Sequence, residues 1–529
     1  MKVFLSLALL IVAVAHIDAA ENSQPPKPAV LPFESSQDPN ASVAQIDALV
    51  FGKLKELGIL PANLCSDSVF LRRVYLDVIG TLPTPEEAAS FISDTRSFKR
   101  AALIDALLDR REFADYWGMK WCDLLRVKAE FPVNLWPNAA QGYDHWIRES
   151  IRENIPYSEF ARQILTANGS NFRAPEVNFY RSAGSKDPKA IAHLVAQVFM
   201  GQRTEKWPAP KLDGMAGFFS EIGFKATGEW KEEIVYFNGV DDSKQMASKP
   251  ILPDGTPVSL SPYSDPRGVF ANWLITSKNS PFAENAVNRI WYWLVGRGII
   301  QEPDDIRPDN PPSNPQLLAW LAQELVSSNY NIKEIYRLIL NSKTYQLSSI
   351  PATQDPKAEA NFAYHPLRRM EAEEMIDALN QITGSAEEYS SMVPEPFTWM
   401  PTDERAVCIP DGSITSSFLD LFGKPPRDTG LLSERNDRPT SAQRLHLLNS
   451  THIQSKLTGS EKLKQLFRSG AAPRDSINQL YLTFLSRYPT NEELAAVRTY
   501  SQTAEAKGWQ VWYDLAWALL NSPEFCYRH

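Results

Sequence analysis

Acidic side chains follow two tryptophans closely in the stretch 288–310. Trp291 and Trp293 precede Glu302, Asp304 and Asp305. A glycoside hydrolase needs two facing carboxyl groups, one of them with a raised pKa, in a groove that often carries aromatic rings. These three acids are therefore candidate catalytic residues, and the chemistry they could perform is hydrolysis of a polysaccharide.

The same stretch contains partners that could turn these acids into structural ion pairs. The other members of this polar cluster are Asn288, Arg289, Arg297, Arg307, Asp309 and Asn310. Structural ion pairs often resemble catalytic sites. Arg307 beside Asp305 can therefore be an anchor for the proline-rich loop 308–315, and we favour this structural interpretation.

A second acidic group stands at 371–374. Glu371, Glu373 and Glu374 follow Arg368 and Arg369. They could also supply a pair of catalytic carboxyl groups. Acidic residues gather in the first turn of a helix, however, because the N-terminal end of a helix is partly positive. We favour the interpretation that they form a charged first turn.

The sequence does not contain the residue patterns that are typical of metal binding, nucleophilic catalysis or phosphate binding. No two histidines stand three or four residues apart, and His-Glu-x-x-His is absent. Asp304, Asp305, Asp309 and Asn310 offer the oxygen ligands that calcium takes, but not with the spacing of a calcium loop. Neither a Gly-x-Ser-x-Gly elbow nor a glycine-rich phosphate loop occurs. The sequence predicts no metal site and no cofactor.

The elements that must position these groups are predicted to be helices, in a mainly α fold. A Tyr-Leu pair followed by a capping-box pattern occurs twice, which predicts a repeated helix-turn-helix unit over 67–128 and 476–525. The capping-box residues are Thr84 with Glu87, and Thr490 with Glu493. Within the first copy, Arg73 and Asp77 are four residues apart, a spacing that predicts an ion pair within one helix.

The chain divides into five predicted segments. In order they are an export signal at 1–19, a flexible Pro- and Ser-rich tether at 20–42, a helical domain at 43–221, a β-ribbon connector at 222–262 and a second helical domain at 263–529. Lys2, an apolar run and small residues near Ala19 predict a cleaved signal peptide and a secreted or periplasmic protein. The apolar run is too short to span a bilayer comfortably, and no later stretch predicts a membrane span.

Composition narrows the classes of protein. Of the 529 residues, 43% are hydrophobic, which is enough for large cores. The net charge of −9 argues against a nucleic-acid partner, which would require a clustered basic face. Four cysteines, Cys65, Cys122, Cys408 and Cys526, could form disulfides in an oxidising compartment, with the pairing left open.

Short motifs in both halves carry a resemblance to a known family. In the first half they occupy 70–77, 80–87, 117–124 and 155–160. In the second half they occupy 288–291, 296–298, 310–315, 340–342 with Tyr345, and 438–443. The sequence resembles an exported planctomycete-type family in which a PSCyt-type domain precedes a PSD-type domain. The resemblance implies a secreted, mainly helical protein whose biochemical role is not established.

One motif of that family is replaced in this chain. Many members follow the helix equivalent to 195–201 with Cys-x-x-Cys-His, a stretch that could hold haem or metal. Here residues 201–208 contain neither cysteine nor histidine. Thioether attachment of haem needs two cysteines and an axial histidine, so the replaced motif cannot make that site.

Three functional hypotheses follow. We expect a non-catalytic interaction or envelope-assembly protein, whose partner is a protein or a polysaccharide of the envelope. The alternative is a secreted, carboxylate-dependent polysaccharide hydrolase that uses the acids near 302–305. The least favoured hypothesis is a redox-associated protein that has lost its Cys-x-x-Cys-His site.

Overall fold

The structure is a computed structural model of the chain. It describes residues 33–40, 44–239, 249–258, 260, 264–276, 281–393, 398–436, 438–468, 472–503 and 508–529. The predicted export signal lies outside the described residues. Part of the predicted tether is described, and there Glu34–Ser35 forms strand β1, which pairs with β2 (Leu64–Cys65). This part of the tether is therefore held by backbone hydrogen bonds.

The first half is a series of short helices. They are α2 (Gln45–Leu57), α3 (Asp67–Ile79), α4 (Pro85–Ser93), α5 (Lys99–Leu108), α6 (Arg111–Leu124), α7 (Pro137–Arg152), α8 (Tyr157–Thr166), α9 (Asn178–Arg181), α10 (Pro188–Val195) and α11 (Ala209–Ala216). A π-helical turn, η2 (Ala196–Met200), continues α10. Short 3-10 turns are η1 (Pro175–Val177), η3 (Thr204–Lys206) and η4 (Gly217–Phe219).

The second half is also helical, which confirms the mainly α prediction. Its helices are α12 (Pro266–Thr276), α13 (Phe282–Val295), α14 (Pro315–Ser327), α15 (Ile332–Asn341), α16 (Ala372–Thr383), α17 (Ser417–Leu421), α18 (Ser441–Asn449), α19 (Thr451–Gly459), α20 (Glu461–Arg468), α21 (Pro473–Leu485), α22 (Asn491–Ser501), α23 (Trp509–Leu520) and α24 (Pro523–Cys526). The 3-10 turns are η5 (Glu359–Asn361), η6 (Ala406–Cys408) and η7 (Leu432–Glu434).

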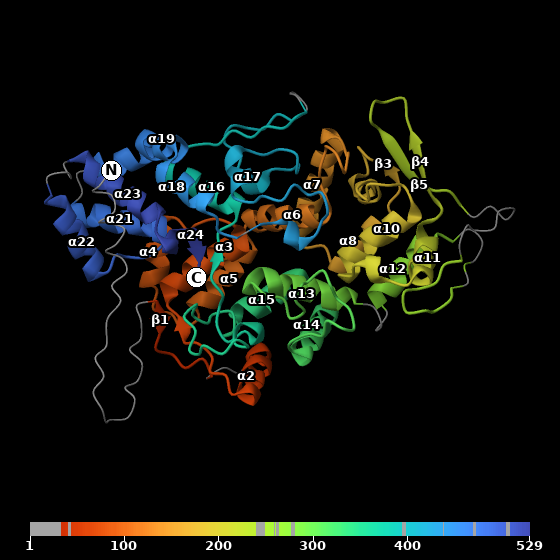
Figure 1. Cartoon of the computed structure of the whole chain (residues 1–529), viewed down its shortest axis with the longest axis horizontal. Coiled ribbons are helices and arrows are strands. Elements are labelled where there is room, and N and C mark those ends of the chain that lie inside the picture. The colour runs from red at the N-terminus through yellow and green to blue at the C-terminus, as the bar shows by residue number, and fades with distance from the viewer. Residues whose placement is uncertain are drawn as a thin grey trace.

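The sheets are small and antiparallel. The predicted ribbon contains β4 (Ile222–Ala226) and β5 (Glu233–Phe237), with Phe224 opposite Val235. Strand β3 (Gly169–Ser170), from the first half, pairs with the other side of β5. Far along the chain, β6 (Arg368–Arg369) pairs with β7 (Tyr527–Arg528). Figure 1 shows the three-stranded sheet at one end of the molecule and the C-terminal helices at the other.

The predicted repeat is present in the local structure of α3–α4 and α21–α22. Both capping boxes form, with the side chain of each threonine accepting from the N–H of the glutamate three residues on. Helices α3 and α21 end at equivalent positions, Gly80 and Ser486, both in the left-handed region, with φ of 61° and 58°. Ser486 adopts this conformation although left-handed φ favours glycine, which indicates that the same turn is required in both copies.

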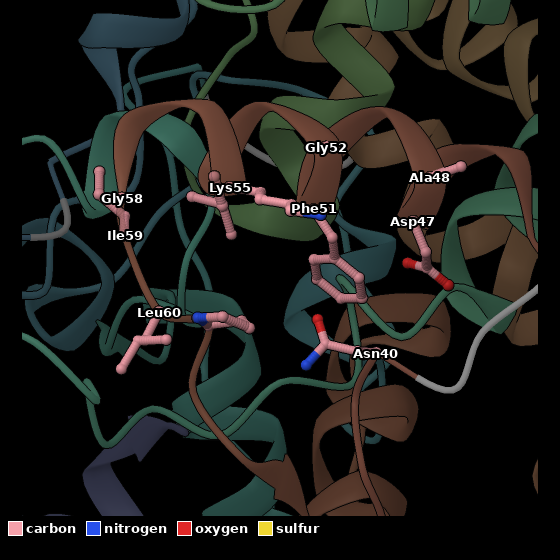
Figure 2. Close-up of a pocket in the computed structure, with 11 residues that line it drawn as sticks. Asn40, Asp47, Ala48, Phe51, Gly52, Lys55, Gly58, Ile59 and Leu60 are labelled. Carbon is pink, nitrogen blue, oxygen red and sulfur yellow. The ribbon is translucent and has the colours of Figure 1, made fainter.

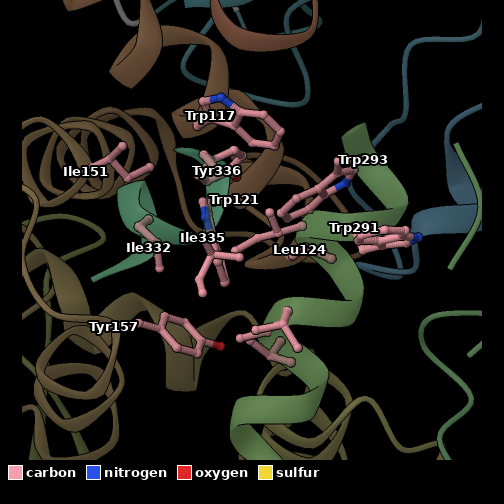
Figure 3. Close-up of a cluster of buried hydrophobic side chains, with 14 of the residues drawn as sticks. Trp117, Trp121, Leu124, Ile151, Tyr157, Trp291, Trp293, Ile332, Ile335 and Tyr336 are labelled. Carbon is pink, nitrogen blue, oxygen red and sulfur yellow. The ribbon is translucent and has the colours of Figure 1, made fainter. Parts of the chain in front are cut away.

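The main hydrophobic core takes side chains from both halves of the chain. Trp117 on α6 packs 4.5 Å from Tyr336 on α15 and 5.3 Å from Trp293 on α13, measured between ring centroids. Figure 3 shows these rings converging, with Trp121 beside them. Such aromatic pairs contribute about 0.5–1.5 kcal/mol each beyond the area they bury. This core therefore joins the N-terminal and C-terminal helices directly.

Candidate functional site

The polar cluster predicted at 288–310 divides into a buried part and an exposed part. Asn288 belongs to the buried part, on α13. Its amide donates to the carbonyl of Ile300 (3.0 Å), and its side-chain oxygen accepts from the N–H of the same residue (2.9 Å). One side chain thus satisfies both backbone groups of Ile300 and fixes the loop that follows α13.

Arg289 and Asp304 form the centre of the buried part. Their side chains are 1% and 2% exposed, and Nη2 lies 2.9 Å from Oδ1. Arg289 also donates to the carbonyls of Gln197 and Val198, which lie in the last turn of the α10–η2 helix, where carbonyls lack partners within the helix. The second oxygen of Asp304 accepts from the N–H of Leu432 (2.7 Å). Both oxygens of this candidate catalytic acid are therefore engaged.

The exposed part holds the other candidates. Glu302 is exposed, whereas Asp305 pairs with Arg307 (3.0 Å). The remaining contacts are Arg307 with Asp309 (2.9 Å), Asn310 with the carbonyl of Asp305 (2.9 Å), and Arg297 with Glu359 (3.6 Å). The structure thus places Glu302 at the surface and Asp304 in the core, so the two acids do not share one environment.

A larger group of charges meets around the first turn of α16. We call it the charged network: ten side chains linked by ion pairs. Its acids are Asp77, Asp123, Glu371, Glu373 and Glu374, and its bases are Lys120, Arg368, Arg427, Arg435 and Arg528. The numbers of acids and bases are equal. The network therefore brings no excess charge into the interior.

Three acids of the charged network, Glu371, Glu373 and Glu374, lie at the start of α16, which is closed by a capping box. Glu371 is the N-cap, and its N–H donates to Oε2 of Glu374 (3.0 Å). The charged first turn predicted from the sequence is thus present. The other oxygen of Glu374 accepts from the hydroxyl of Tyr116 (2.7 Å) and pairs with Arg528. The same acids therefore cap the helix and bind charges from distant elements.

Asp77 on α3 does not form the ion pair predicted with Arg73. It binds Arg528 (2.9 Å) and the hydroxyl of Tyr345 (2.8 Å). Arg73 instead donates to backbone carbonyls, among them that of Tyr345 (2.6 Å) and that of Leu347 (2.9 Å). The prediction was wrong because both side chains are buried on faces of α3 that pack against other elements, which supply closer partners.

Arg435 joins acids from both halves. Its Nη2 lies 2.7 Å from Asp123 on α6, and its Nη1 lies 2.6 Å from Glu373 and 3.1 Å from Glu371 on α16. Arg427 binds the second oxygen of Asp123 at 2.9 Å. A planar guanidinium suits this role because its fork of donors can bind several carboxylates at once.

The charges of the network determine how its members titrate. Burial alone would raise the pKa of Glu371, but Arg435, Lys120 and Arg528 outweigh burial and hold the pKa well below its ordinary range. Burial is likewise outweighed at Asp123, where Arg435 and Arg427 lower the pKa. Burial lowers the pKa of Lys120. The two acids therefore stay ionised at neutral pH.

A small cavity opens beside the network, and we call it the charged pocket. Its volume is about 100 Å³. Its charged lining residues are Lys120, Asp123, Arg368, Arg369, Glu371, Arg435 and Arg528, and the others include Tyr292, Trp293 and Leu432. The cavity can hold waters or one small polar group. The lining contains bases and ionised acids, and neither of its acids is held protonated.

Several members of the network were not predicted from the sequence, namely Lys120, Asp123, Arg427, Arg435 and Arg528. A signal existed for two of them. Lys120 and Asp123 interrupt the aromatic face of the helix that begins before Trp117, and Asp123 lies in one of the family motifs. A charged residue within an apolar helical pattern indicates a buried partner. The three arginines lie in segments whose position depends on tertiary packing.

A second cavity, of about 440 Å³, lies between α2 and the segment that follows it. Figure 2 shows Phe51 pointing from α2 into this space, with Asn40 on the opposite side. Asp47, at its edge, already accepts from the N–H groups of Lys343 and Thr344 at 2.9 and 2.8 Å. Its lining offers few polar groups that converge, so it is the weaker candidate for a site.

The four cysteines form no disulfide, whereas His446 and His452 share a hydrogen bond (3.2 Å) and His452 lies 2.9 Å from a carboxylate oxygen of Glu387. Cys65, Cys122, Cys408 and Cys526 are all free thiols in the structure. Within the described residues, no cluster of three or more His, Cys, Asp or Glu side chains is arranged to hold a metal ion. None of the described helices combines the length and the apolar character that a membrane crossing needs.

Comparison with known proteins identifies both halves. Residues 45–206 match the family model PSCyt2, described as a protein of unknown function (DUF1549). Residues 266–501 match PSD1, described as a protein of unknown function (DUF1553). No curated protein and no solved structure matches the chain. The chain belongs to the family of two-domain proteins in which a PSCyt2 domain is followed by a PSD1 domain.

Proposed function

We propose that this protein is an exported, non-catalytic interaction module. In this role, the charged network and the shared core hold the two matched regions together as a rigid platform for a protein or polysaccharide partner. One observation carries the proposal. The acids that line the charged pocket are each paired with at least two bases, Asp123 with Arg427 and Arg435 and Glu371 with Lys120 and Arg435, and these bases lower the pKa of both acids.

A carboxylate-dependent hydrolase needs the opposite arrangement. One of its two acids must have a raised pKa so that it can donate a proton to the leaving group. Asp304 is not placed to give a proton to a leaving group, because both its oxygens are bound in a buried interface with Arg289 and Leu432. The hydrolase alternative is therefore less well supported.

Asp377 on α16 is one of the described acids whose pKa is raised, as a proton donor requires. Burial raises its pKa to about 6. Its two oxygens, however, accept from the N–H groups of Ala406 (2.7 Å) and Val407 (3.2 Å). These bonds assign it to holding the turn η6, and it is not among the residues that line the charged pocket.

The network suits a platform because it fixes geometry. Its ion pairs connect α3 and α6 in the PSCyt2 region with β6, the N-cap of α16 and the 427–435 segment in the PSD1 region. Buried ion pairs add little net stability. The native packing pairs every charge of the network, however, and alternative packings that leave one of these charges unpaired are therefore excluded. Rigid surfaces lose less entropy when they bind a partner.

Assays for sugar release test the non-catalytic part of the proposal. The purified chain, Glu371→Gln and Glu302→Gln are incubated with neutral and acidic polysaccharides, and new reducing ends are measured. We expect no release above the background of the buffer from any of the three. Release by the native chain that falls at least 100-fold in Glu371→Gln or in Glu302→Gln, with the fold retained, would overturn the proposal.

Mass analysis of the exported chain tests cleavage near Ala19.

A further inference from the structure

An open groove runs between α19 and α23, away from the charged pocket. Its volume is about 360 Å³. This value lies within the range of about 300–1,000 Å³ that is typical of small-molecule sites. Two hydrogen bonds join α23 to α18, the helix directly before α19. The indole N–H of Trp517 donates to the carbonyl of Leu448 (3.2 Å), and the amide of Asn521 donates to that of Leu447. The walls of the groove are therefore set by the fold.

Among the residues that the structure describes, none that lines this groove carries a formal charge. From α19 it is lined by Thr451, Gln454, Ser455 and Thr458, which occupy the exposed face of the helix. The charged residue of α19, Lys456, is buried on the opposite face and binds Glu387 (3.1 Å).

Two aromatic rings face these polar groups from α23, Trp509 and Tyr513. Trp509 is 38% exposed. Its orientation is held by Phe467, whose ring it meets edge-on at 5.1 Å. Phe467 in turn stacks on Trp512 at 5.1 Å. The indole ring of Trp509 is therefore an ordered, partly exposed apolar surface at the edge of a polar groove.

Several polar groups in the groove are available to a ligand. Among the described residues, the side chains of Gln454, Ser455 and Tyr513 make no hydrogen bond to the protein, whereas Gln510 donates to Asp514 (2.7 Å). Amides and hydroxyls both donate and accept hydrogen bonds. The described lining of the groove thus presents hydrogen-bond donors and acceptors and an aromatic surface, without a charged side chain.

We propose that this groove binds a short segment of a neutral polysaccharide. A sugar ring has hydroxyl groups that donate and accept, and an apolar C–H face that packs on an aromatic ring. Acidic glycans fit less well, because the described lining of the groove offers no cation and the chain carries a net charge of −9. The inference rests on the proposed function, since it names the partner class of the interaction module.

Titration with defined oligosaccharides tests the groove. The probes are neutral hexasaccharides of glucose, xylose and mannose, with hexagalacturonate as the acidic comparison, and binding is measured by calorimetry and tryptophan fluorescence. We expect at least one neutral probe to bind, with affinity at least tenfold weaker in Trp509→Ala and in Gln454→Glu. Trp399→Ala is the matched control, because Trp399 is 59% exposed but lies outside the groove, and its affinity should equal that of the native chain.

The outcomes separate this inference from the proposed function. The same incubations are assayed for new reducing ends. Binding without release supports both proposals, and binding with release removes the non-catalytic function but keeps the groove. If no neutral probe binds saturably, the proposal that the groove binds a polysaccharide is wrong, and the non-catalytic function is unaffected. The groove proposal is also overturned if hexagalacturonate binds instead, or if both groove variants, folded by circular dichroism, bind as tightly as the native chain.

Discussion

Asp77 and Arg528 are 451 positions apart in the sequence, and their side chains form an ion pair of 2.9 Å with 0% and 2% of their surface exposed. The pair connects α3 with β7. Arg528 also binds Glu374 on α16, so one guanidinium serves acids from both halves of the chain. Because Asp77 and Glu374 are buried, water cannot take the place of Arg528 as their hydrogen-bond partner.

Replacing Arg528 with methionine should destabilise the fold strongly. The substitution keeps much of the side-chain volume but leaves Asp77 and Glu374 as buried acids without this partner. Removal of one member of a buried ion pair typically costs about 3–5 kcal/mol. Urea unfolding followed by circular dichroism measures the loss. Arg96→Met is the control, since Arg96 pairs with Asp94 at the surface, and its midpoint should not change. Equal midpoints for Arg528→Met and the native chain would contradict this role.

Two arginines of the 288–310 cluster, Arg289 and Arg307, should differ in their effect on stability. Arg289→Met removes the partner of buried Asp304 and of two helix carbonyls, and we expect a loss of about 3–5 kcal/mol. Arg307→Met breaks ion pairs at the surface, where Asp309 is 73% exposed, and we expect a loss of about 0–1 kcal/mol. Urea midpoints of the two variants give the comparison. A larger loss for Arg307→Met would show that the exposed part of the cluster is the anchor.

The predictable parts of this fold are those that depend on neighbouring residues. The capping boxes at Thr84 and Thr490 were predicted because the required side chains stand three residues apart. Strand β5 lies where β-branched residues before an Asn-Gly pair predict extended chain, whereas the turn that joins it to β4, at 227–232, contains neither Asn-Gly nor Asp-Gly. The charged first turn at Glu371 belongs to the same class. In each case the interaction closes within a few residues.

The charged network could not be predicted in the same way. Its bases come from α6, β6, the 427–435 segment and β7, and nothing in the local sequence of Arg435 indicates that it meets Asp123. The Arg73–Asp77 prediction failed for the related reason that four-residue spacing describes an exposed helix surface, whereas both side chains are buried. With a single sequence, contacts between distant elements have no local signal.

Acid should destabilise the protein through the network. Folding lowers the pKa values of Asp123 and Glu371 from their ordinary values of 3.8 and 4.5. At a pH near these ordinary values, the unfolded chain therefore binds more protons than the folded chain. Stability from these groups is therefore complete above those values and is lost as the pH falls through them towards the lower folded pKa values. We expect the melting temperature to fall steadily from pH 5 to about pH 3.

Glu371→Gln provides the matched test of that pH dependence. Glutamine cannot ionise, so the difference in melting temperature between Glu371→Gln and the native chain should be largest at pH 7 and shrink as the pH approaches 3. Scanning calorimetry from pH 3 to pH 7 measures it. A difference that stays constant over this range would mean that the charge of Glu371 contributes nothing to stability.

The two capping boxes should contribute similarly to stability, because their surroundings are alike. In each copy an arginine binds the glutamate of the box and lies 5.4 Å from the ring of the preceding tyrosine: Arg110 with Glu87 and Tyr75, and Arg487 with Glu493 and Tyr481. The two arginines are not at equivalent positions, since Arg487 follows Ser486 directly whereas Arg110 lies beyond α5. The repeat thus preserves the arrangement of charges and not only the sequence pattern.

Thr84→Ala and Thr490→Ala should each cost about 1 kcal/mol, the usual loss when an N-cap threonine is removed. Urea unfolding of both single variants and of the double variant measures the losses, which should add because the two boxes cap separate helices and share no partner. Thr499→Ala is the control, because Thr499 is exposed within α22 and alanine favours the helix, so its midpoint should be unchanged or higher. If Thr490→Ala lowered the stability but Thr84→Ala did not, interactions of neighbouring residues would hold the start of α4 without the capping hydrogen bond of Thr84. In that case Arg110 would hold the start of α4 through Glu87 alone, and Arg110→Met would then become the destabilising substitution.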